Sequence, residues 1–285
     1  MDMSVKFHCD LNSNFRASDE MVRAFIYDDY SIEPHTHDFY EMNIVMEGIG
    51  THIINNHSIS VQRGHIFVIP PGYVHSYVNT EGLKVYHILL KAEFLFQHQQ
   101  EIQQSDGYHF LMEIEPFLRH HSVQQLFLRL SPEQMMTVIP ELYSIDEKQG
   151  ILYPQSYVYK NLSVLRLILL FSHWLLQQIQ QKQKRISHDK EFGIINALKY
   201  IHKYYNQHIT IDALCRQAYM SRSTFLRTFC AVCDCTPMQY VQMYRKQRAI
   251  ELLRTGALKK TEIAHQCGFY DLSHMEKAIS ASFQP

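Results

Sequence analysis

Residues 262–274 read EIAHQCGFYDLSH, the pattern of a short amphipathic helix, a turn at Gly268 and the start of a second helix. The chain carries the same pattern once earlier. The copies match in LCRQA (214–218) and FLRTF (225–229) of the first, and in IAHQC (263–267) and MEKAI (275–279) of the second. Glycine tolerates the backbone of such a turn, and Ser221 can cap the second helix of the first copy. The repeat predicts an all-α module with two helix-turn-helix motifs.

The charge of the chain is unevenly distributed. Residues 185–285 hold 14 Lys and Arg against 8 Asp and Glu, a net +6, whereas residues 1–184 hold 13 against 20, a net −7. A basic module on an acidic body indicates a polyanionic partner, most simply nucleic acid. Arg227 and Lys277 occupy equivalent positions of the two second helices, where a groove-reading helix presents a cation. The helical stretch 240–254 would hold the motifs apart, which predicts an extended DNA site.

Composition indicates a globular protein of the cytoplasm. Hydrophobic residues make up 46% of the chain and charged residues 19%, which is enough apolar material for a core. Six cysteines and a start, MDMSVKFHCD, without an apolar signal-peptide region argue for a reducing compartment. The most apolar stretch, Leu162–Leu176, is interrupted by Arg166 and His173 and is short for a bilayer span, so no membrane segment is expected.

Short apolar and β-branched runs predict a small antiparallel β unit between Met21 and Leu90. The runs are MVRAFIY (21–27), YEMNIVMEG (40–48), GTHIINNHSISV (50–61), GHIFVIPPG (64–72) and LKVYHILL (83–90). Asn55-Asn56 fits a tight hairpin turn, because asparagine tolerates a positive φ. This many strands close together favour a barrel or a double sheet.

From about residue 92 the periodicity is helical, and no further strand is expected. Positions at alternating spacings of three and four form one stripe on a helix: Leu162, Leu165, Leu169, Ser172, Leu176 and Ile179. The stripe is either core of the spacer or a face on which two copies pair as a homodimer. The polar tract 177–190 predicts a linker. The α+β chain is therefore divided into a β domain (1–95), a helical linker and dimerisation region (96–184) and a DNA-binding domain (185–285).

Two histidine motifs lie in the β unit. His35, His37, Glu41 and Gly48 form HxH-x3-E-x6-G, and residues 64–79 form G-x5-P-x-G-x2-H-x3-N around His75. Together they resemble the two motifs of the cupin barrel, without the leading glycine of the first. The resemblance implies a cupin-like antiparallel β-barrel in which the three histidines and Glu41 converge, as cupin metal ligands do. They either line an effector pocket without metal, hold a transition metal, or serve packing.

The C-terminal module is similar to that of AraC/XylS-type transcription regulators. The resemblance is carried by SRSTFLRTF (221–229), TPMQY (236–240), RKQRAIELL (245–253) and EIAHQCGFYDLSH (262–274). It implies recognition helices at about 221–230 and 271–283. The DNA-facing positions that it implies are Arg222, Ser223, Leu226, Arg227, Leu272, Ser273, His274 and Lys277. The family usually has Phe where this chain has Met275 and Ile279, which predicts a smaller contribution from the second motif.

These observations predict a sequence-specific transcription regulator, an activator on the family's pattern, that responds to a small molecule such as a carbohydrate. Tyr40, Tyr73 and Tyr77 would supply walls and hydroxyls of its effector pocket, beside the four histidine-motif residues. The expected partners are promoter DNA, the effector, a second copy of the chain and RNA polymerase, with no cofactor and no catalytic residue. Two alternatives stay open: a metal-dependent cupin enzyme fused to a DNA-binding module, and a ligand-blind dimeric regulator.

Overall fold

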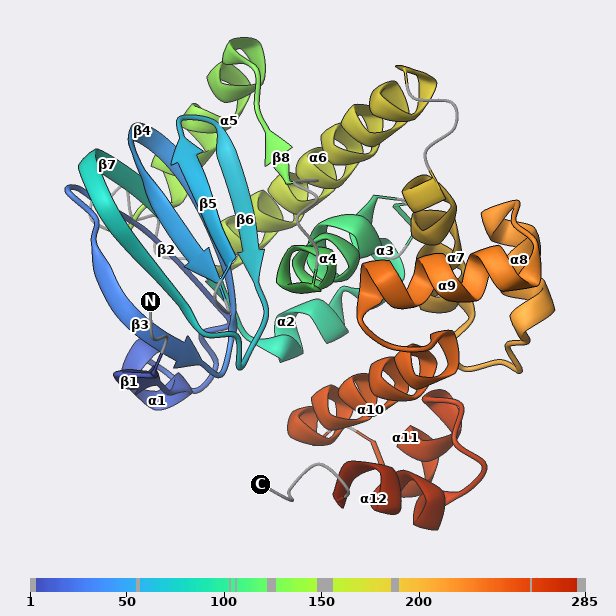
Figure 1. Cartoon of the computed structure of the whole chain (residues 1–285). Coiled ribbons are helices and arrows are strands. Elements are labelled where there is room, and N and C mark those ends of the chain that lie inside the picture. Colours follow the sequence, from blue (N-terminus) through green and yellow to red (C-terminus); the bar gives the residue numbers. More distant parts are fainter. Residues whose placement is uncertain are drawn as a thin grey trace. The chain divides into compact units, whose positions relative to one another are not determined.

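Figure 1 shows the chain as a computed structural model, which describes residues 4–54, 57–102, 104–105, 107–121, 127–147, 156–185, 190–256 and 258–280. The chain folds into two compact units, Met1–Gln181 and Lys182–Pro285. The helices that follow the strands belong to the first unit as far as Gln181. The division into 1–95, 96–184 and 185–285 stays a prediction, and the turn expected at Asn55-Asn56 lies outside the described residues.

The strands of the first unit form one hydrogen-bonded sheet. They are β1 (Phe7–Cys9), β2 (Val22–Tyr27), β3 (Ile32–His37), β4 (Tyr40–Ile54), β5 (His57–Gln62), β6 (His65–Ile69), β7 (His75–Leu90) and β8 (Leu128–Arg129). The order along the main path is β1-β3-β7-β4-β6-β8, while β2 also pairs with β7 and β5 also pairs with β4.

The long strands β4 and β7 run antiparallel through both halves of this sheet. The start of β4 and the end of β7 pair with β6 and β2, and their other ends pair with β5 and β3. Register shifts between Val45 and Thr51 mark where the halves meet. There Gly48 has φ 76°, and a Cβ on it would lie 2.2 Å from the carbonyl oxygen of Gly82. Only glycine permits this approach of the two backbones.

The predicted cupin-like β domain with helices after it is confirmed, and three details differ. β1 pairs with β3 in parallel, so the sheet is mixed rather than antiparallel. Among the described strands, the pairing does not close the sheet into a barrel. β8 joins β6 through Leu128 opposite Ile66, so the expectation of no strand after residue 92 is wrong. A two-residue strand is too short to produce a periodicity, which is why the sequence did not reveal it.

Helices of the first unit follow the strands. They are α2 (Ala92–Gln97), α3 (Gln99–Ile102), the π-helix η1 (Phe110–Ile114), α4 (Glu115–His121), α5 (Pro132–Ile145) and α6 (Ser156–Arg185), and α1 (Leu11–Asn14) precedes them near the N-terminus. Half-buried Glu147 ties α6 to β2, because its carboxylate lies 3.1 Å from Lys160 Nζ and 3.0 Å from Arg23 Nη2. The helix α6 runs on through Arg185, so the tract expected to be a linker begins as helix.

The helix α6 is longer than the apolar stretch within it. By length and composition, Tyr157–Gln181 is apolar enough to cross a membrane, with a mean hydropathy of 1.4. The argument that no segment is long enough to span a bilayer is therefore wrong. Residues that make up 44% of the most apolar window are buried inside the protein, and core helices of water-soluble domains have the same composition. One such helix is weak evidence for a membrane.

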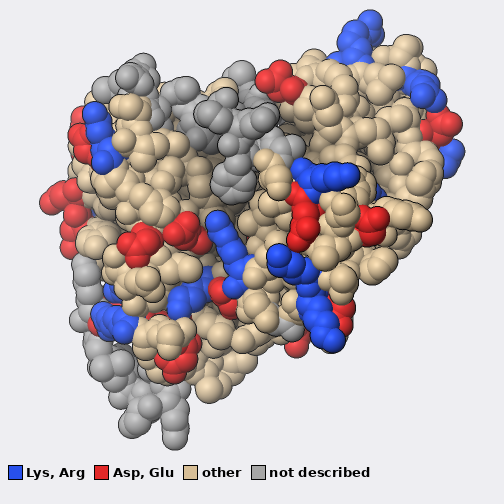
Figure 2. Space-filling view, turned by 90° about the horizontal axis from the view of Figure 1, so that it is seen from below, with Lys and Arg blue, Asp and Glu red and all other residues tan. Residues whose placement is uncertain are grey.

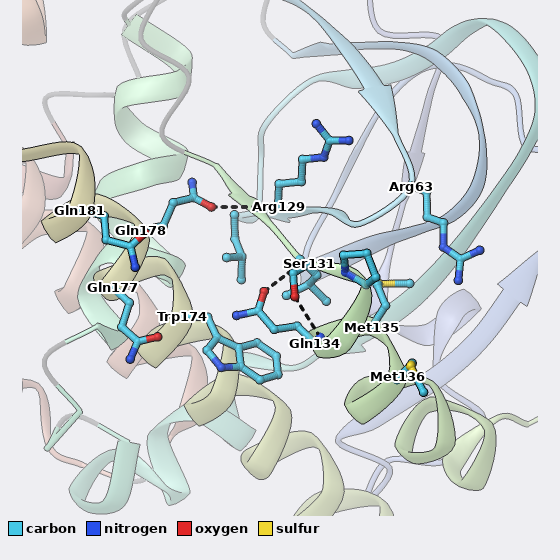
Figure 3. Close-up of a pocket in the computed structure, with 13 residues that line it drawn as sticks. Arg63, Arg129, Ser131, Gln134, Met135, Met136, Trp174, Gln177, Gln178 and Gln181 are labelled. Atoms are coloured by element: carbon cyan, nitrogen blue, oxygen red, sulfur yellow. Dashed lines mark hydrogen bonds between the residues drawn. The ribbon is translucent and has the colours of Figure 1, made fainter. Parts of the chain in front are cut away.

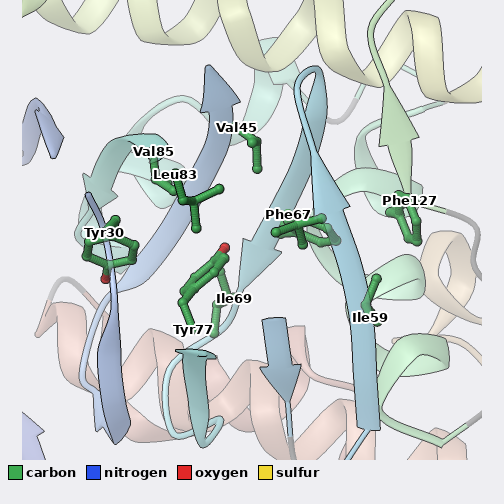
Figure 4. Close-up of a cluster of buried hydrophobic side chains, with 10 residues drawn as sticks. Tyr30, Val45, Ile59, Phe67, Ile69, Tyr77, Leu83, Val85 and Phe127 are labelled. Carbon is green, nitrogen blue, oxygen red and sulfur yellow. The ribbon is translucent and has the colours of Figure 1, made fainter. Parts of the chain in front are cut away.

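The core between the two halves of the sheet combines aromatic and aliphatic side chains. Figure 4 shows Tyr30, Phe67 and Tyr77 pointing into it, together with aliphatic side chains of β4, β5, β6 and β7. The ring of Tyr30 meets that of Tyr77 edge to face with centroids 5.3 Å apart, and Phe127, just before β8, packs against Phe67. Such pairs add to the burial of apolar surface. The aromatic packing fixes how β4 and β7 present their polar side chains.

The second unit is entirely helical in its described part. Its helices are α7 (Lys190–Tyr204), α8 (Ile211–Ala218), α9 (Arg222–Cys233), α10 (Pro237–Thr255), α11 (Lys260–Gln266) and α12 (Leu272–Ser280). The pairs α8–α9 and α11–α12 are the two expected helix-turn-helix motifs, and α10 joins them. Of the expected inward-facing side chains, Leu214, Phe225, Phe229, Ile263 and Met275 are buried and Ile279 is half-buried.

Candidate functional site

The first candidate recognition helix, α9, begins with a side-chain cap. Ser221 Oγ accepts a hydrogen bond from the backbone amide of Thr224, which satisfies one of the free donors at the helix start. Phe225 and Phe229 anchor the opposite face in the core, so Ser223 and Arg227 are exposed. Leu226 is partly buried. The structure therefore places Ser223 and Arg227 on an accessible side of α9.

The two arginines of α9 differ in their surroundings. Arg222 Nη1 lies 3.2 Å from Asp212 Oδ1 of α8, and both side chains are exposed. In the part of the chain that the structure describes, Arg227 has no ion-pair partner. An exposed pair such as Arg222–Asp212 is weak and can exchange its carboxylate for a phosphate. Arg227 is the guanidinium already free to meet a base edge.

The second candidate recognition helix, α12, is capped by Asp271, whose Oδ1 accepts from the backbone amide of His274 at 2.7 Å. Ser273, His274 and Lys277 are exposed and Leu272 is half-buried. Its neighbour Glu276 forms an ion pair with Lys260 of α11 at 3.4 Å. This helix thus presents one lysine where α9 presents two arginines. On the face shown in Figure 2, basic side chains lie next to acidic ones.

The turns of the two motifs require the same unusual backbone. Tyr219 is the C-cap of α8 and has φ 53°, and Gly268, which follows the C-cap Cys267 of α11, has φ 74°. In the left-handed region a Cβ is strained by about 1 kcal/mol. The tyrosine side chain is 90% exposed, so packing does little to offset this cost.

We expect Tyr219→Gly to raise the free energy of unfolding by roughly 0.5–1 kcal/mol, because glycine removes the strain but makes the unfolded chain more flexible. Gly268→Ala is the opposite case. Its new Cβ would lie 2.8 Å from Asn206 Cα, and the alanine would have to adopt the strained positive φ. The free energy of unfolding should therefore fall. Urea unfolding of the full chain, followed by circular dichroism, measures both. A loss of stability in Tyr219→Gly would show that the exposed ring stabilises the turn.

The histidine motifs come together around Glu41 of β4. Glu41 Oε1 lies 2.6 Å from His87 Nδ1, and Oε2 lies 3.2 Å from His75 Nε2 and 3.5 Å from His37 Nε2. The His35 ring lies over that of His75 with centroids 4.2 Å apart. All five side chains are buried. The convergence that the cupin resemblance implied is therefore present in the structure.

The protonation of this cluster follows from its burial. Burial lowers the pKa of His35 and of His37 to about 4, so both are neutral near pH 7. Burial alone would raise the pKa of Glu41, but its interactions with His75 and His87 outweigh that effect and hold the pKa well below the usual value. The Nε2 atoms of His37, His75 and His87 have no hydrogen bond of good geometry within the described structure. A buried carboxylate is thus surrounded by imidazoles with unsatisfied ring nitrogens.

The donor set fits a divalent transition metal. His35, Glu41 and His75 each offer a ligand atom, and the three atoms lie within 4.8 Å of one another. Neutral imidazole and carboxylate are ordinary ligands of such metals. His37 is not one of the three, and its Nδ1 instead contacts the carbonyl oxygen of Phe39 at 2.6 Å. The set that converges most closely is smaller than the four-residue set implied by the resemblance.

Two histidines of the cluster escaped sequence reasoning. His87 holds Glu41, and His52 Nε2 lies 3.4 Å from His75 Nδ1. Neither belongs to a recognised motif. The antiparallel register, which puts His52 beside Tyr77 and His87 beside Asn43, brings them in. The available signal was a histidine at a buried position of a β run.

The three tyrosines expected in an effector pocket lie in or against the core. Tyr40 and Tyr77 are buried, and Tyr73 packs against the same apolar cluster as Tyr77. The Tyr77 hydroxyl accepts a hydrogen bond from Asn43 Nδ2 at 3.2 Å. Burial raises the pKa of Tyr73 to about 12, so its hydroxyl stays protonated. These positions put the tyrosine rings among packed side chains.

Comparison with known proteins matches both units. The model of the AraC-like ligand binding domain matches residues 19–134, and that of a helix-turn-helix domain matches residues 214–284. The uncharacterized HTH-type transcriptional regulator YdeC of Bacillus subtilis is 24% identical over 86% of this chain and 82% of its own. The HTH-type transcriptional activator RhaS of Escherichia coli is 24% identical over 87% and 84%. ToxT of Vibrio cholerae with bound unsaturated fatty acid matches over 94% of both chains, with 14% identity and a TM-score of 0.36.

Two capped helix-turn-helix motifs and a ligand-binding domain match define a DNA-binding transcription regulator with a ligand-binding domain. The chain belongs to the AraC/XylS family of transcription regulators. The predicted family, fold class and regulatory function are thereby confirmed. The relatives YdeC and RhaS are both named as transcription regulators.

Proposed function

We propose that this protein is a homodimeric, effector-responsive activator that reads promoter DNA through α9 and α12. The observation that carries the proposal is the pair of capped helices with exposed cations, Arg227 on α9 and Lys277 on α12, held in one unit by α10. Arg222, Ser223 and Leu226 on α9, and Leu272, Ser273 and His274 on α12, are the further proposed DNA contacts. The DNA site is correspondingly extended.

The test is selection of bound duplexes from a randomised pool by the purified full chain. We expect a recurring sequence, and an affinity for it that falls steeply as salt rises, because a module with net +6 displaces counterions from phosphates. Selection that yields no preferred sequence, or binding that is insensitive to salt, contradicts the proposal. Salt concentration must be fixed when sequences are compared.

The proposed dimer forms along α6. Of the stripe expected from sequence, Ser172 and Ile179 are buried in the first unit, whereas Leu162 is 60% and Leu169 38% exposed. Val158, 65% exposed, extends the exposed side toward the start of the helix. Val158, Leu162, Leu165 and Leu169 follow spacings of four, three and four, which suits pairing with the same face of a second copy.

We expect Leu162→Glu to weaken dimerisation at least tenfold, because the carboxylate would have to be buried in the apolar seam. Sedimentation over a concentration series measures the change. Ile49→Glu, which alters another exposed apolar residue outside α6, is the control and should leave the association unchanged. Equal effects of the two variants, or none, would exclude α6 as the interface.

For the histidine cluster we propose an effector-linked role for His35, His37, Glu41 and His75, with Tyr40, Tyr73 and Tyr77 around them. A small polar effector, such as a carbohydrate, would use the unsatisfied imidazole nitrogens as partners. The test is His35→Ala with His37→Ala in the full chain. DNA binding without effector should persist while the effector response is lost. Equal loss of both would contradict a separate sensory role.

The distances among His35, Glu41 and His75 favour a second candidate, a divalent metal at this cluster. When bound, the metal would be held by these three side chains and would order the ends of β3, β4 and β7. Metal analysis of protein purified without chelator, with Glu41→Leu as the control, decides between them. Metal bound at one ion per chain, with no turnover of any substrate, would be consistent with a regulator that contains a metal. Turnover would instead support the cupin enzyme.

The remaining parts of the proposal follow from family membership. We propose that the protein works in the cytoplasm, where promoter DNA is accessible, that it contacts RNA polymerase as activators do, and that it is not an enzyme. Transcription from a reporter that carries the selected site, with and without the protein, tests the sign of regulation. Repression at every position of the site would contradict activation.

A further inference from the structure

A cavity of about 840 Å³ lies in the first unit between β8, the start of α5 and the last turns of α6 (Figure 3). This volume is within the range of small-molecule sites, about 300–1,000 Å³. None of the residues expected to bind effector lines it. The cavity is therefore separate from the histidine cluster.

The charge of the cavity is opposite to that of its surroundings. Arg63 and Arg129 line it, and no Asp or Glu does, although residues 1–184 together carry a net −7. Within the described portion of the chain, neither guanidinium has an ion-pair partner. The guanidinium group presents a planar fork of donors that matches carboxylate and phosphate. The unpaired arginines thus favour an anionic ligand.

The walls combine polar and apolar side chains, among them the indole of Trp174. In Figure 3 this side chain projects from α6 toward Gln134 and Met135 of α5. Met135 is buried, and Trp174 is only half-buried, so part of its ring is available to a ligand. An accessible aromatic face suits a flat apolar group.

The position of the cavity is fixed by hydrogen bonds between its two sides. Gln178 of α6 donates from Nε2 to the carbonyl oxygen of Phe127 at 3.0 Å and accepts at Oε1 from the Arg129 amide at 3.3 Å. These bonds tie the edge strand β8 to α6. The cationic side and the aromatic side are therefore held together before any ligand arrives.

We propose that this cavity binds a small organic anion, with its anionic group at Arg63 or Arg129 and its flat apolar body against the accessible part of the Trp174 ring. As a binding site it stands by itself, and only its role as an effector site rests on the proposed function. Trp174 lies on α6, the helix that also carries the exposed stripe of Leu162 and Leu169, so a ligand here would act directly on the proposed dimer helix.

The test uses the fluorescence of Trp174, which is the single tryptophan of the chain. The full chain is titrated with 4-phenylbutanoate and with its neutral analogue 4-phenylbutanamide. We expect a saturable change with the carboxylate and at least tenfold weaker binding of the amide. Phenyl phosphate, as a third probe, separates preference for phosphate from preference for carboxylate. Equal binding of acid and amide, or no saturable change with either anion, overturns the proposal.

Variants assign the effect to the arginines. Arg63→Gln with Arg129→Gln should remove the preference for the acid over the amide, whereas Arg166→Gln should keep it. Arg166 is a suitable control because it is an exposed arginine of α6 outside the cavity, paired with Glu141 at 2.9 Å. Retention of the preference in the double variant also overturns the proposal. DNA binding is measured on the same samples, so a failed anion test with intact DNA binding leaves the proposed function in place.

Discussion

Replacing Glu41 by leucine is expected to lower the free energy of unfolding of the full chain by about 3 kcal/mol. The carboxylate is the shared partner of His75 and His87, at 3.2 and 2.6 Å, in a site closed to water. Leucine fills a similar volume but leaves Nδ1 of the buried His87 without its hydrogen-bond partner. Leaving such groups unpaired costs more than the net strength of the bonds they lose. Urea unfolding, with the free energy extrapolated to zero denaturant, measures the change.

Two further variants serve as controls for Glu41→Leu. Glu47→Leu removes the carboxylate that lies 3.2 Å from Lys84 on the surface, and should cost far less stability than Glu41→Leu because water screens that pair. Glu41→Gln keeps an oxygen for His87 and offers an amide donor toward His75, so its cost should lie between the other two. A Glu41→Leu protein as stable as the parent would show that the cluster does not stabilise the fold. It would favour a binding role for these buried polar side chains instead.

The helical half of the molecule could be predicted in detail because its signals are local. The turn at Gly268, the cap at Ser221 and the apolar spacing of Phe225 and Phe229 each act within a few residues, so the motif is readable from the order of the letters. The structure confirms the inward faces and places Arg227 and Lys277 on exposed ones.

The histidine site could be predicted only in part, because strand register decides it. The motif spacing brought His35, Glu41 and His75 together correctly. His87 and His52 join them through pairing between β4 and β7, which no short pattern encodes. The same limitation applies to the two-residue strand β8, which places its second residue, Arg129, at the rim of the cavity. These features depend on long-range strand pairing rather than on local propensity, so the sequence alone could not predict them.

The effects of the arginine and the lysine on DNA recognition should differ in kind. Arg227→Ala should weaken binding to the selected site by about 1–3 kcal/mol, which is roughly 5- to 150-fold, and relax the preference at one base position. Its guanidinium is exposed on α9, unpaired among the described residues, and shaped for a bidentate contact with guanine. Binding-site selection and titration at one fixed salt concentration measure both effects.

Lys277→Ala should cost less and weaken all sequences evenly, since a flexible ammonium group meets phosphate more often than a base edge. The helix that carries Lys277 also has a half-buried Ile279 where α9 has the fully buried Phe229, so its hold on the core is weaker. Arg166→Ala in the first unit is the control and should change neither affinity nor preference. If Lys277→Ala shifts the preferred sequence while Arg227→Ala does not, α12 rather than α9 contributes most to sequence recognition.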